Sequence, residues 1–509
     1  TSHQFNVTFV SDLKKKYEVN ASMTDTSVKA PKKTFQTKDL YVGFTTSVDS
    51  TKAYMRAGDL DVNFDGRGYV EDIIGQLNAF TTRAGEQWTS RTINQEELKT
   101  LLPGICLKAT SGSDNPISNY LSMMQGISFE RLHLDFDTSP EEGINGEAYL
   151  YQMHADSLLV DTIGIDLKHG EDGLDFLTEV ISTAKPNQEA FEVNLDGSIG
   201  NGKAQLLLQY LNARKEKGVY LGVDAALGRR GIRMKLFPEN PILVYRPFYL
   251  NPRNYIYLAD RGRFYGDVRL YDDQGTGIHF YTNREDTIAD QEMTVELSRI
   301  DLKQFKKVLP YLPDVEGWLG GSAHYVDSEG QMMLSADVSL DNFVYEKSPL
   351  GNWTMNGVYL PGDNNAHHVD GFITHNDREI IYMNGIYQTD ETGQENITGE
   401  LELQHFPLWV INPFVPDGIV NFRGDIDGTL AMEGNPLKPV LNGGLQLDSV
   451  LMVMPDMSIG FRFDNKEVKM QDSKMVFDKF NIYTRGETPF VVNGSVDFSD
   501  LEKMMVDLR

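Results

Sequence analysis

One stretch of the sequence has the residue types and spacing of a calcium-binding loop. Residues 61–66 read D-V-N-F-D-G, and Asp72 stands at the twelfth position from Asp61. In such loops, carboxylate and amide oxygens at alternate positions surround the ion. The twelfth position prefers Glu, however, and apolar residues alternate with the polar ones throughout 60–65. We therefore interpret this stretch as a strand with a wet acidic face that runs into a turn.

The one cluster of histidines is a second candidate for metal chemistry. His367 and His368 are followed by Asp370 and His375, and imidazole with carboxylate is a common ligand set for transition metals. The turn-forming residues P-G-D-N-N precede the cluster at 361–365. We therefore expect a solvated loop here and no metal site.

Local signatures of catalysis are absent from the sequence. No nucleophile elbow, phosphate-binding glycine loop, Cys-x-x-Cys pair or His-Glu-x-x-His motif occurs. Cys106 is the single cysteine, which excludes a disulfide within the chain, and its aliphatic neighbours predict a buried thiol. Glycosidase carboxylates have no local signature, so an enzyme of that class is not excluded by motif. We expect no enzyme activity, no cofactor and no metal.

Charge narrows the possible partners. The chain has 47 Lys and Arg against 74 Asp and Glu, a net charge of −27, which argues against nucleic acid. The same sign argues against binding by plain attraction to anionic lipid headgroups. A local basic patch is formed by Arg229, Arg230, Arg233, Arg246 and Arg253. Its simplest interpretation is solvated turn charge, and its functional alternative is contact with phosphate headgroups or lipopolysaccharide.

Strands must position all these residues, because apolar and polar residues alternate along much of the chain. From Val420 to Met432 every even position is apolar or glycine, which gives a strand one apolar and one polar face. The pattern recurs at 441–447, 459–463 and 490–498. The sequence therefore predicts a mostly β protein with a long two-faced sheet, and no apolar run approaches the ~20 residues of a membrane helix.

Four segments follow from the changes in pattern. The first is a β-rich segment over 1–126. Its residues 1–94 resemble strands joined by turns, and Asn94 and Asn115 are expected to begin short helices within 95–126. Residues 127–292 form strands and hairpins, one of them from 204 to 226, with a short helix near 172–184. Segments 293–399 and 400–509 are two groove repeats.

The two last segments share an internal repeat of about 105 residues. Each copy begins with a strand, passes through a short helix-like bridge and an acidic turn, and resumes long alternating strands. The matched positions are Leu297 with Leu403, Pro313-Asp314 with Pro416-Asp417, Gly321 with Gly424, and Leu340-Asp341 with Leu447-Asp448. Drift in the spacing indicates insertions in turns, which repeat proteins tolerate.

The second copy resembles the TamB proteins, members of the AsmA-like group of Gram-negative envelope proteins. The resemblance is carried by F-P-L at 406–408, N-P-F at 412–414, G-D-I-D-G-T-L at 424–430, G-N-P at 434–436 and P-V-L-N-G-G-L at 439–445. It is clearest over 295–509 and fainter over 127–292. The membrane anchor and the C-terminal module of that family are not in this sequence, and the alternating residues at both ends predict a fragment of a longer chain.

The resemblance implies an elongated, curled antiparallel β-sheet with an apolar groove inside and a polar exterior. It also implies a periplasmic bridge, anchored in the inner membrane through a missing segment, that conducts phospholipid to the outer membrane. An outer-membrane barrel partner would be met through missing regions. The expected groove residues are Val338, Leu340, Val420, Phe422, Ile426, Leu430, Met432, Leu441, Leu445, Leu447, Ile459, Phe461, Phe463, Val492 and Val496.

Two other functions remain open at this point. A chaperone-like scaffold for outer-membrane protein assembly would hold nascent strands at free sheet edges. A secreted β-sandwich array, either an adhesin or a carbohydrate-active protein, would instead cover its apolar faces with one another. The decisive question is whether the apolar faces meet each other or line an open surface.

Overall fold

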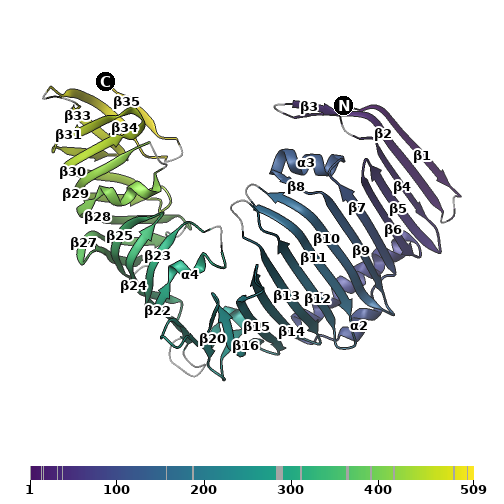
Figure 1. Ribbon diagram of the computed structural model, residues 1–509. Helices are drawn as coiled ribbons and strands as arrows, with labels where there is room; N and C mark the ends of the chain where they lie inside the picture. Colours follow the sequence, from purple (N-terminus) through teal and green to yellow (C-terminus); the bar gives the residue numbers. More distant parts are fainter. Residues whose placement is uncertain are drawn as a thin grey trace. The chain divides into compact units, whose positions relative to one another are not determined.

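The computed structural model shows a mostly β protein, as the alternation predicts (Figure 1). It describes residues 2–12, 14, 16–30, 33–36, 38–155, 158–185, 189–282, 290–309, 312–362, 366–389, 392–415, 419–484, 486, 488–500 and 503–509. The chain divides into two compact units, unit 1 over Thr1–Gly262 and unit 2 over Arg263–Arg509. The prediction of long antiparallel sheet with few helices is confirmed. The four finer segments stay a prediction.

Unit 1 is an antiparallel ladder in which successive strands pair with one another. β1, β2, β4, β5, β6, β7 and β9 pair in that order, and β10 to β16 continue the series to β19. Short strands attach to its margins. The bounds are β1 Ser2–Ser11, β2 Tyr17–Ala30, β3 Lys33–Gln36, β4 Leu40–Thr46, β5 Ser50–Ala57, β6 Leu60–Arg67, β7 Ile105–Gly112, β8 Ile127–Ser128, β9 Arg131–Ser139, β10 Gly143–Ala155, β11 Leu158–His169, β12 Leu174–Ser182, β13 Phe191–Gly200, β14 Lys203–Asn212, β15 Lys217–Gly228, β16 Gly231–Leu243, β17 Arg246–Pro247, β18 Tyr249–Leu250 and β19 Tyr255–Ala259.

Unit 2 is built in the same way. β20 to β30 pair in chain order, β31 and β32 both pair with β30, and β33, β34 and β35 complete the ladder. The bounds are β20 Phe264–Tyr271, β21 Gly277–Thr282, β22 Gln291–Asp301, β23 Val315–Ser328, β24 Gln331–Tyr345, β25 Ser348–Pro361, β26 Ala366–His375, β27 Arg378–Thr389, β28 Glu395–Pro407, β29 Asn421–Gly434, β30 Val440–Met454, β31 Ile459–Phe463, β32 Glu467–Gln471, β33 Lys474–Tyr483, β34 Phe490–Asp497 and β35 Met505–Leu508.

The helices lie where the chain leaves the ladder. They are α1 Val70–Thr89, α2 Gln95–Thr100, α3 Pro116–Gln125 and α4 Leu302–Phe305, with 3-10 turns at Asp260–Gly262, Leu408–Phe414 and Pro455–Met457. The two expected helix starts are confirmed. Asn94 accepts a hydrogen bond from the Glu97 backbone N–H (3.1 Å), and Asn115 accepts one from that of Ser118 (3.0 Å). Among the described residues, no helix is long and apolar enough to cross a membrane.

Two sequence expectations about these elements are wrong. Residues 70–89 form a 20-residue helix and not strands, and its N-terminal neighbour Tyr69 gives no side-chain cap, so no start signal is present. The helix expected near 172–184 is strand β12, because it has a ladder partner on each side in β11 and β13. Thr178 and Val180 in that strand are β-branched, which favours extended backbone.

The hairpin expected from 204 to 226 and the two helix-like bridges are confirmed. β14 and β15 pair antiparallel, with Ala204 opposite Ala225. The bridges are α4, between β22 and β23, and the 3-10 turn Leu408–Phe414, between β28 and β29. Asp301 begins α4 by accepting a hydrogen bond from the Lys303 backbone N–H (3.1 Å).

Candidate functional site

Strand register places the alternating apolar residues of unit 2 on one face of the sheet. Residues directly opposite each other in an antiparallel pair point to the same side. Val338 of β24 lies opposite Met355 of β25, which lies opposite Ile373 of β26. The row continues through Ile381 of β27 to Leu403 of β28. We call this side of unit 2 the apolar face.

All the expected groove residues except Val420 lie in strands and on the apolar face. Leu430 of β29 lies opposite Gly443 of β30, and Leu445 of β30 lies opposite Gly428 of β29. Val420 directly precedes β29 and is half-buried. The others are Val338 and Leu340 on β24; Phe422, Ile426 and Met432 on β29; Leu441 and Leu447 on β30; Ile459, Phe461 and Phe463 on β31; and Val492 and Val496 on β34.

β-Bulges keep this face apolar along long strands in which the apolar residues change from odd to even positions. In β30 the apolar-face residues stand at odd positions up to Leu447 and at even positions from Met452. The change of phase occurs at Ser449, which has a left-handed backbone (φ 53°) next to a register shift. A bulge adds one residue to one strand and so reverses the phase beyond it.

Both copies of the internal repeat have a bulge at the matching position, and this position corrects one of the residue matches predicted from the sequence. Asn342 in β24 (φ 51°) corresponds to Ser449 in β30, and both adjoin register shifts. Gly321 lies opposite Val338 as Gly428 lies opposite Leu445. Gly321 therefore corresponds to Gly428 and not to Gly424 as the sequence predicts. The match of Pro313-Asp314 with Pro416-Asp417 falls partly outside the described residues.

The apolar face is covered by its own side chains in one region and exposed in another. Leu430, Leu445 and Met470 are buried, and the side chains packed around them are Leu401, Leu403, Ile426, Leu441 and Met475. In contrast, Met355 is 47% exposed and Met383 36% exposed. The described strands of unit 2 are joined edge to edge in one hydrogen-bonded sheet, and not in the two separate sheets of a β-sandwich. The apolar face is thus open over β24 to β27.

One edge of the face is bordered by the second bridge. Trp409, in the 3-10 turn Leu408–Phe414, contacts His375 at the end of β26, with ring centroids 5.8 Å apart. Phe414 in the same turn stacks on Tyr345 at the end of β24 (4.6 Å). The second bridge therefore packs against the ends of β24 and β26 and forms the border of the apolar face on that side.

The histidine cluster is not a loop, because it lies in strand β26. His367 and His375 share the side of Val369, whereas His368 and Asp370 point to the other side. His375 is buried, its ring centroid lies 4.6 Å from that of Trp353, and its Nε2 lies 2.9 Å from the Leu350 carbonyl oxygen. The expected solvated loop is therefore wrong, and strand pleating keeps the four side chains from converging on one ion.

The calcium-like stretch is a strand, as interpreted from its alternation. Asp61 and Asp65 lie on β6, on the face opposite Phe64. Asp61 forms an ion pair with Arg56 (3.5 Å) and Asp65 with Lys52 (3.1 Å), both across to β5. Neighbouring lysine and arginine thus balance the carboxylates.

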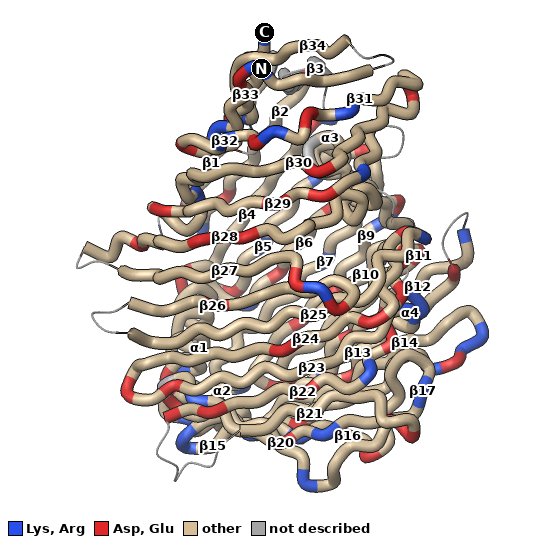
Figure 2. The backbone as a smooth tube through the Cα atoms, turned by 90° about the vertical axis from the view of Figure 1, so that its left-hand side faces the viewer, with Lys and Arg blue, Asp and Glu red and all other residues tan. Residues whose placement is uncertain are grey.

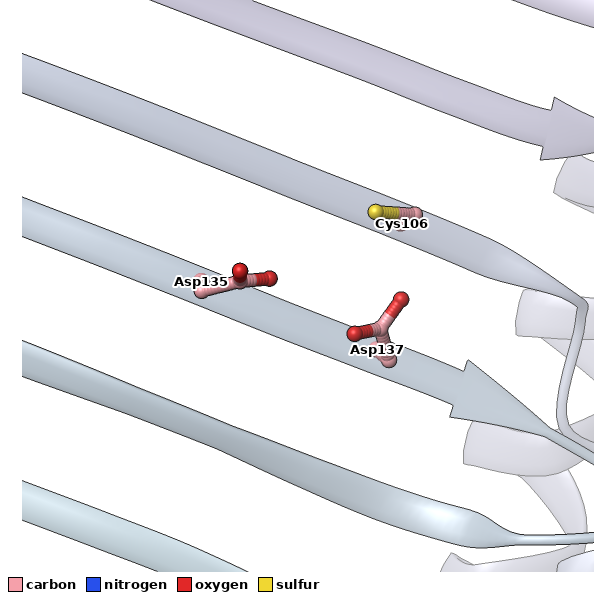
Figure 3. A group of neighbouring side chains, drawn as sticks. All are labelled: Cys106, Asp135 and Asp137. Atoms are coloured by element: carbon pink, nitrogen blue, oxygen red, sulfur yellow. The ribbon is translucent and has the colours of Figure 1, made fainter.

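The prediction of a buried thiol at Cys106 is wrong, because Cys106 is half-buried and does not have the apolar surroundings that its sequence neighbours predict. It lies on β7 opposite Asp137 of β9, on the polar side of the sheet, with Asp135 nearby (Figure 3). Burial, together with a hydrogen bond to Asp137, raises the pKa of the Cys106 thiol. Lys108 pairs with Asp135 (2.7 Å). A thiol held protonated beside a paired carboxylate is a poor metal ligand, because ligation requires the thiolate.

The basic patch is distributed over several elements. Arg229 and Arg230 lie in the exposed turn between β15 and β16, in agreement with solvated turn charge. Arg233 lies on β16, with its guanidinium 5.4 Å from the Tyr255 ring centroid. Such cation–π contacts account for its position without a phosphate ligand.

Unit 1 has an apolar side of the same construction and a pocket that the sequence analysis did not find. Leu107 of β7 lies opposite Phe136 of β9, which lies opposite Gly146 of β10. The pocket lies beneath α1 and α2 at the strand ends. It could not be predicted because its lining comes from seven strands, β10 to β16, and two helices, and because the sequence predicts strands where α1 lies.

The comparisons with known proteins give no assignment. Neither a family model, nor a curated protein, nor a solved structure matches the chain. The resemblance to TamB proteins therefore stays a prediction.

Proposed function

We propose that the chain is a periplasmic bridge segment that conducts phospholipid between the inner and outer membranes along the apolar face of its sheet. The observation that carries this proposal is the open apolar face over β24 to β27, where Met355 and Met383 are exposed. Contiguous exposed apolar surface beyond a few hundred Å2 is uncommon on a protein that binds nothing.

Transfer free energies explain why such a face suits a lipid conduit. Exposing an acyl chain of about 15 methylenes to water costs roughly 12 kcal/mol, at ~0.8 kcal/mol per methylene. An extended apolar floor removes much of that cost without a single tight site, so the lipid keeps its mobility. The headgroup can stay in water at the open side and needs no dedicated receptor.

The opposite side of the sheet is suited to water. Glu400 and Asp425 alternate with the apolar-face residues of β28 and β29, and acidic segments appear on both strands (Figure 2). Charged side chains along a strand also discourage unwanted edge pairing. The inner-membrane anchor and the outer-membrane barrel partner rest on the resemblance alone.

Photocrosslinking tests the proposal with controls matched for exposure. A photoreactive residue is placed at Met355 (47% exposed) or Met383 (36%) on the apolar face, and at Val358 (36%) or Ile386 (40%) on the other. These controls share a row with polar residues, since Val358 lies opposite Asp370. In cells, phospholipid adducts are expected from the first two positions only.

Equal labelling of both sides by lipid would contradict conduction along one face. Adducts with polypeptide in place of lipid would favour the chaperone-like scaffold for outer-membrane proteins. Adducts with polysaccharide would favour the carbohydrate-active alternative. The three outcomes are separated by the mass of the adduct.

A further inference from the structure

Unit 1 has a half-open apolar pocket of about 390 Å3 between α1, α2 and the apolar side of its sheet. The floor is one row of cross-strand partners from β12 to β15, formed by Leu174, Ile199, Ala204 and Ala225. Ile199 is 51% exposed, so the floor is open to water at this point. The volume is near the lower end of the range of about 300–1,000 Å3 that ligand pockets have.

The helices α1 and α2 lie above this floor and are joined to each other by the buried Gln87. Its amide nitrogen donates a hydrogen bond to Glu97 (2.9 Å), and its oxygen accepts one from the Asn94 backbone N–H (2.7 Å). The helical side chains that line the pocket include Phe80, Trp88 and Leu98.

Two contacts attach the pair of helices to the sheet at different strands. The Gln95 side-chain amide lies 3.1 Å from Nε2 of His169, at the end of β11. Arg91 forms an ion pair with Asp260 (3.4 Å), directly after β19. The helices are therefore held above the floor, and the space beneath them is a feature of the fold of unit 1.

The lining of the pocket is almost wholly apolar, and this limits the chemistry of a ligand. Lys203 borders the pocket but belongs to the polar side of β14, because it lies opposite Ala226, whereas the floor residue Ala204 lies opposite Ala225. A polypeptide or a sugar would leave amide or hydroxyl groups without hydrogen-bond partners over this floor, which is costly. A hydrocarbon chain has no such groups. The lining therefore favours the acyl chain of a lipid.

An acidic hollow adjoins the pocket at the strand ends and indicates the charge of the head group. Lys99 and His169 line both the pocket and the hollow. The carboxylates that line the hollow are those of Glu96, Glu141, Glu142 and Glu171. Glu141 forms an ion pair with Arg67 (3.6 Å), whereas among the described residues no lysine or arginine pairs with the other three. A head group at this rim therefore meets an excess of negative charge beside the Lys99 ammonium group.

We propose that the pocket holds an acyl chain of a phospholipid with a zwitterionic head group, such as phosphatidylethanolamine. The ammonium group of the lipid faces the glutamates of the hollow, and its phosphate lies towards Lys99. An anionic head group has no ammonium group and is repelled by the same carboxylates. This inference deepens the proposed function, on which it rests, by naming the class of phospholipid that unit 1 binds.

Photolabelling of the unaltered chain tests the site without any folding defect. Photoreactive phosphatidylethanolamine and phosphatidylglycerol with the same acyl chains are presented in micelles of an uncharged detergent. We expect phosphatidylethanolamine to label peptides from 80–104 and 199–232 roughly two- to fivefold more strongly, as for exposed ion pairs. Equal labelling by the two lipids, or equally strong labelling by photoreactive palmitic acid, would overturn the head-group assignment. Labelling confined to 263–509 would overturn the pocket.

Filling the floor tests where the acyl chain lies. Ala225→Trp is expected to reduce labelling of peptides from 80–104 by phosphatidylethanolamine at least tenfold. Ala323→Trp, the matched change on the apolar face of unit 2, is expected to leave this labelling unchanged. Equal labelling of Ala225→Trp and the unaltered chain would contradict binding over the floor row.

Neutralising the hollow tests the role of its carboxylates. Glu142→Gln combined with Glu171→Gln is expected to remove the preference for phosphatidylethanolamine. Glu400→Gln combined with Glu433→Gln changes the net charge equally at exposed positions on the polar side of unit 2, and is expected to preserve the preference. A preference that survives the first pair of changes, or is lost with the second, would refute this role.

The pocket and the conduction proposed for unit 2 can fail separately. Lipid crosslinks at Met355 and Met383 without a preference for phosphatidylethanolamine in unit 1 would refute the pocket assignment alone. Preferential labelling of peptides from 80–104 without those crosslinks would refute conduction and support the pocket.

Discussion

Leu430→Ala is the substitution that best tests how the apolar face is held together. Leu430 is 6% exposed, and the side chains around it come from its own strand and neighbouring strands of the same face. Truncating a buried leucine costs about 2–5 kcal/mol, depending on how far the site collapses. Since the cluster is bounded on one side by half-buried residues that can move, we expect the lower part of that range, about 2–3 kcal/mol.

Amide hydrogen exchange is the suitable assay, because a chain of 509 residues with two units need not unfold in one step. A loss of about 2–3 kcal/mol accelerates exchange through opening roughly 30- to 150-fold. The acceleration is expected in β28 to β30 and not in unit 1. Mass spectrometry of peptides from the folded chain measures both regions in one experiment.

Leu334→Ala provides the matched control on the same face. Leu334 is 40% exposed, so its truncation is expected to cost less than about 1 kcal/mol and to accelerate exchange in β23 to β25 less than about fivefold. If the two substitutions had equal effects, Leu430 would not be buried by its same-face neighbours, and the account of the covered region would be wrong.

Three further predictions follow from single sites. Gly428→Ala is expected to destabilise unit 2 by more than about 1 kcal/mol in thermal unfolding, because φ is 149° and a Cβ would lie 2.2 Å from the Gly444 carbonyl oxygen. Gly357→Ala is the control and is expected to be tolerated, because the atom nearest to its added Cβ would be 3.8 Å away. Alkylation of Cys106 at pH 7.5 is expected to be slow, since burial and Asp137 raise its pKa, and Asp137→Asn is expected to accelerate it, as mass spectrometry will show. The hydrogen bond from Arg83 lowers the pKa of Glu97, so the contribution of Glu97 to the contact between α1 and α2 is present above its unfolded pKa and lost as pH falls through the folded value. Amide-exchange protection of α1 and α2 is therefore expected to decrease in acid, and Glu97→Gln to remove that dependence, as mass spectrometry of peptides from this region will measure.

Strand and face could be predicted from the sequence because both depend on a local pattern. Alternation at Ile426, Leu430 and Met432 marks a strand with an apolar side, and the partner strand shows the same pattern. The helix α1 could not be predicted in the same way. Tyr69 offers no cap, and Gly75 and Gly85 weaken its helical propensity, so its stability depends on the sheet beneath it.

The pocket could not be predicted from the sequence for a related reason. Its floor row joins Leu174, Ile199, Ala204 and Ala225, which become neighbours only when four strands take one particular register. No residue in the row has a chemical type that indicates a ligand. A site made of ordinary aliphatic residues is visible only through the space that the fold leaves between them.

The bulges show that alternation in the sequence alone does not determine which side chains share a face of the sheet. Leu445 and Met452 face the same side although one is odd and the other even, because the left-handed residue Ser449 changes the phase between them. Without that extra residue, the side chains beyond it would turn to the opposite side of the sheet. The corresponding bulge at Asn342 lies at the matching place in the first repeat. The conserved feature of the two copies is therefore a phase correction, and an apolar face that continues from strand to strand depends on it as much as on the aliphatic residues themselves.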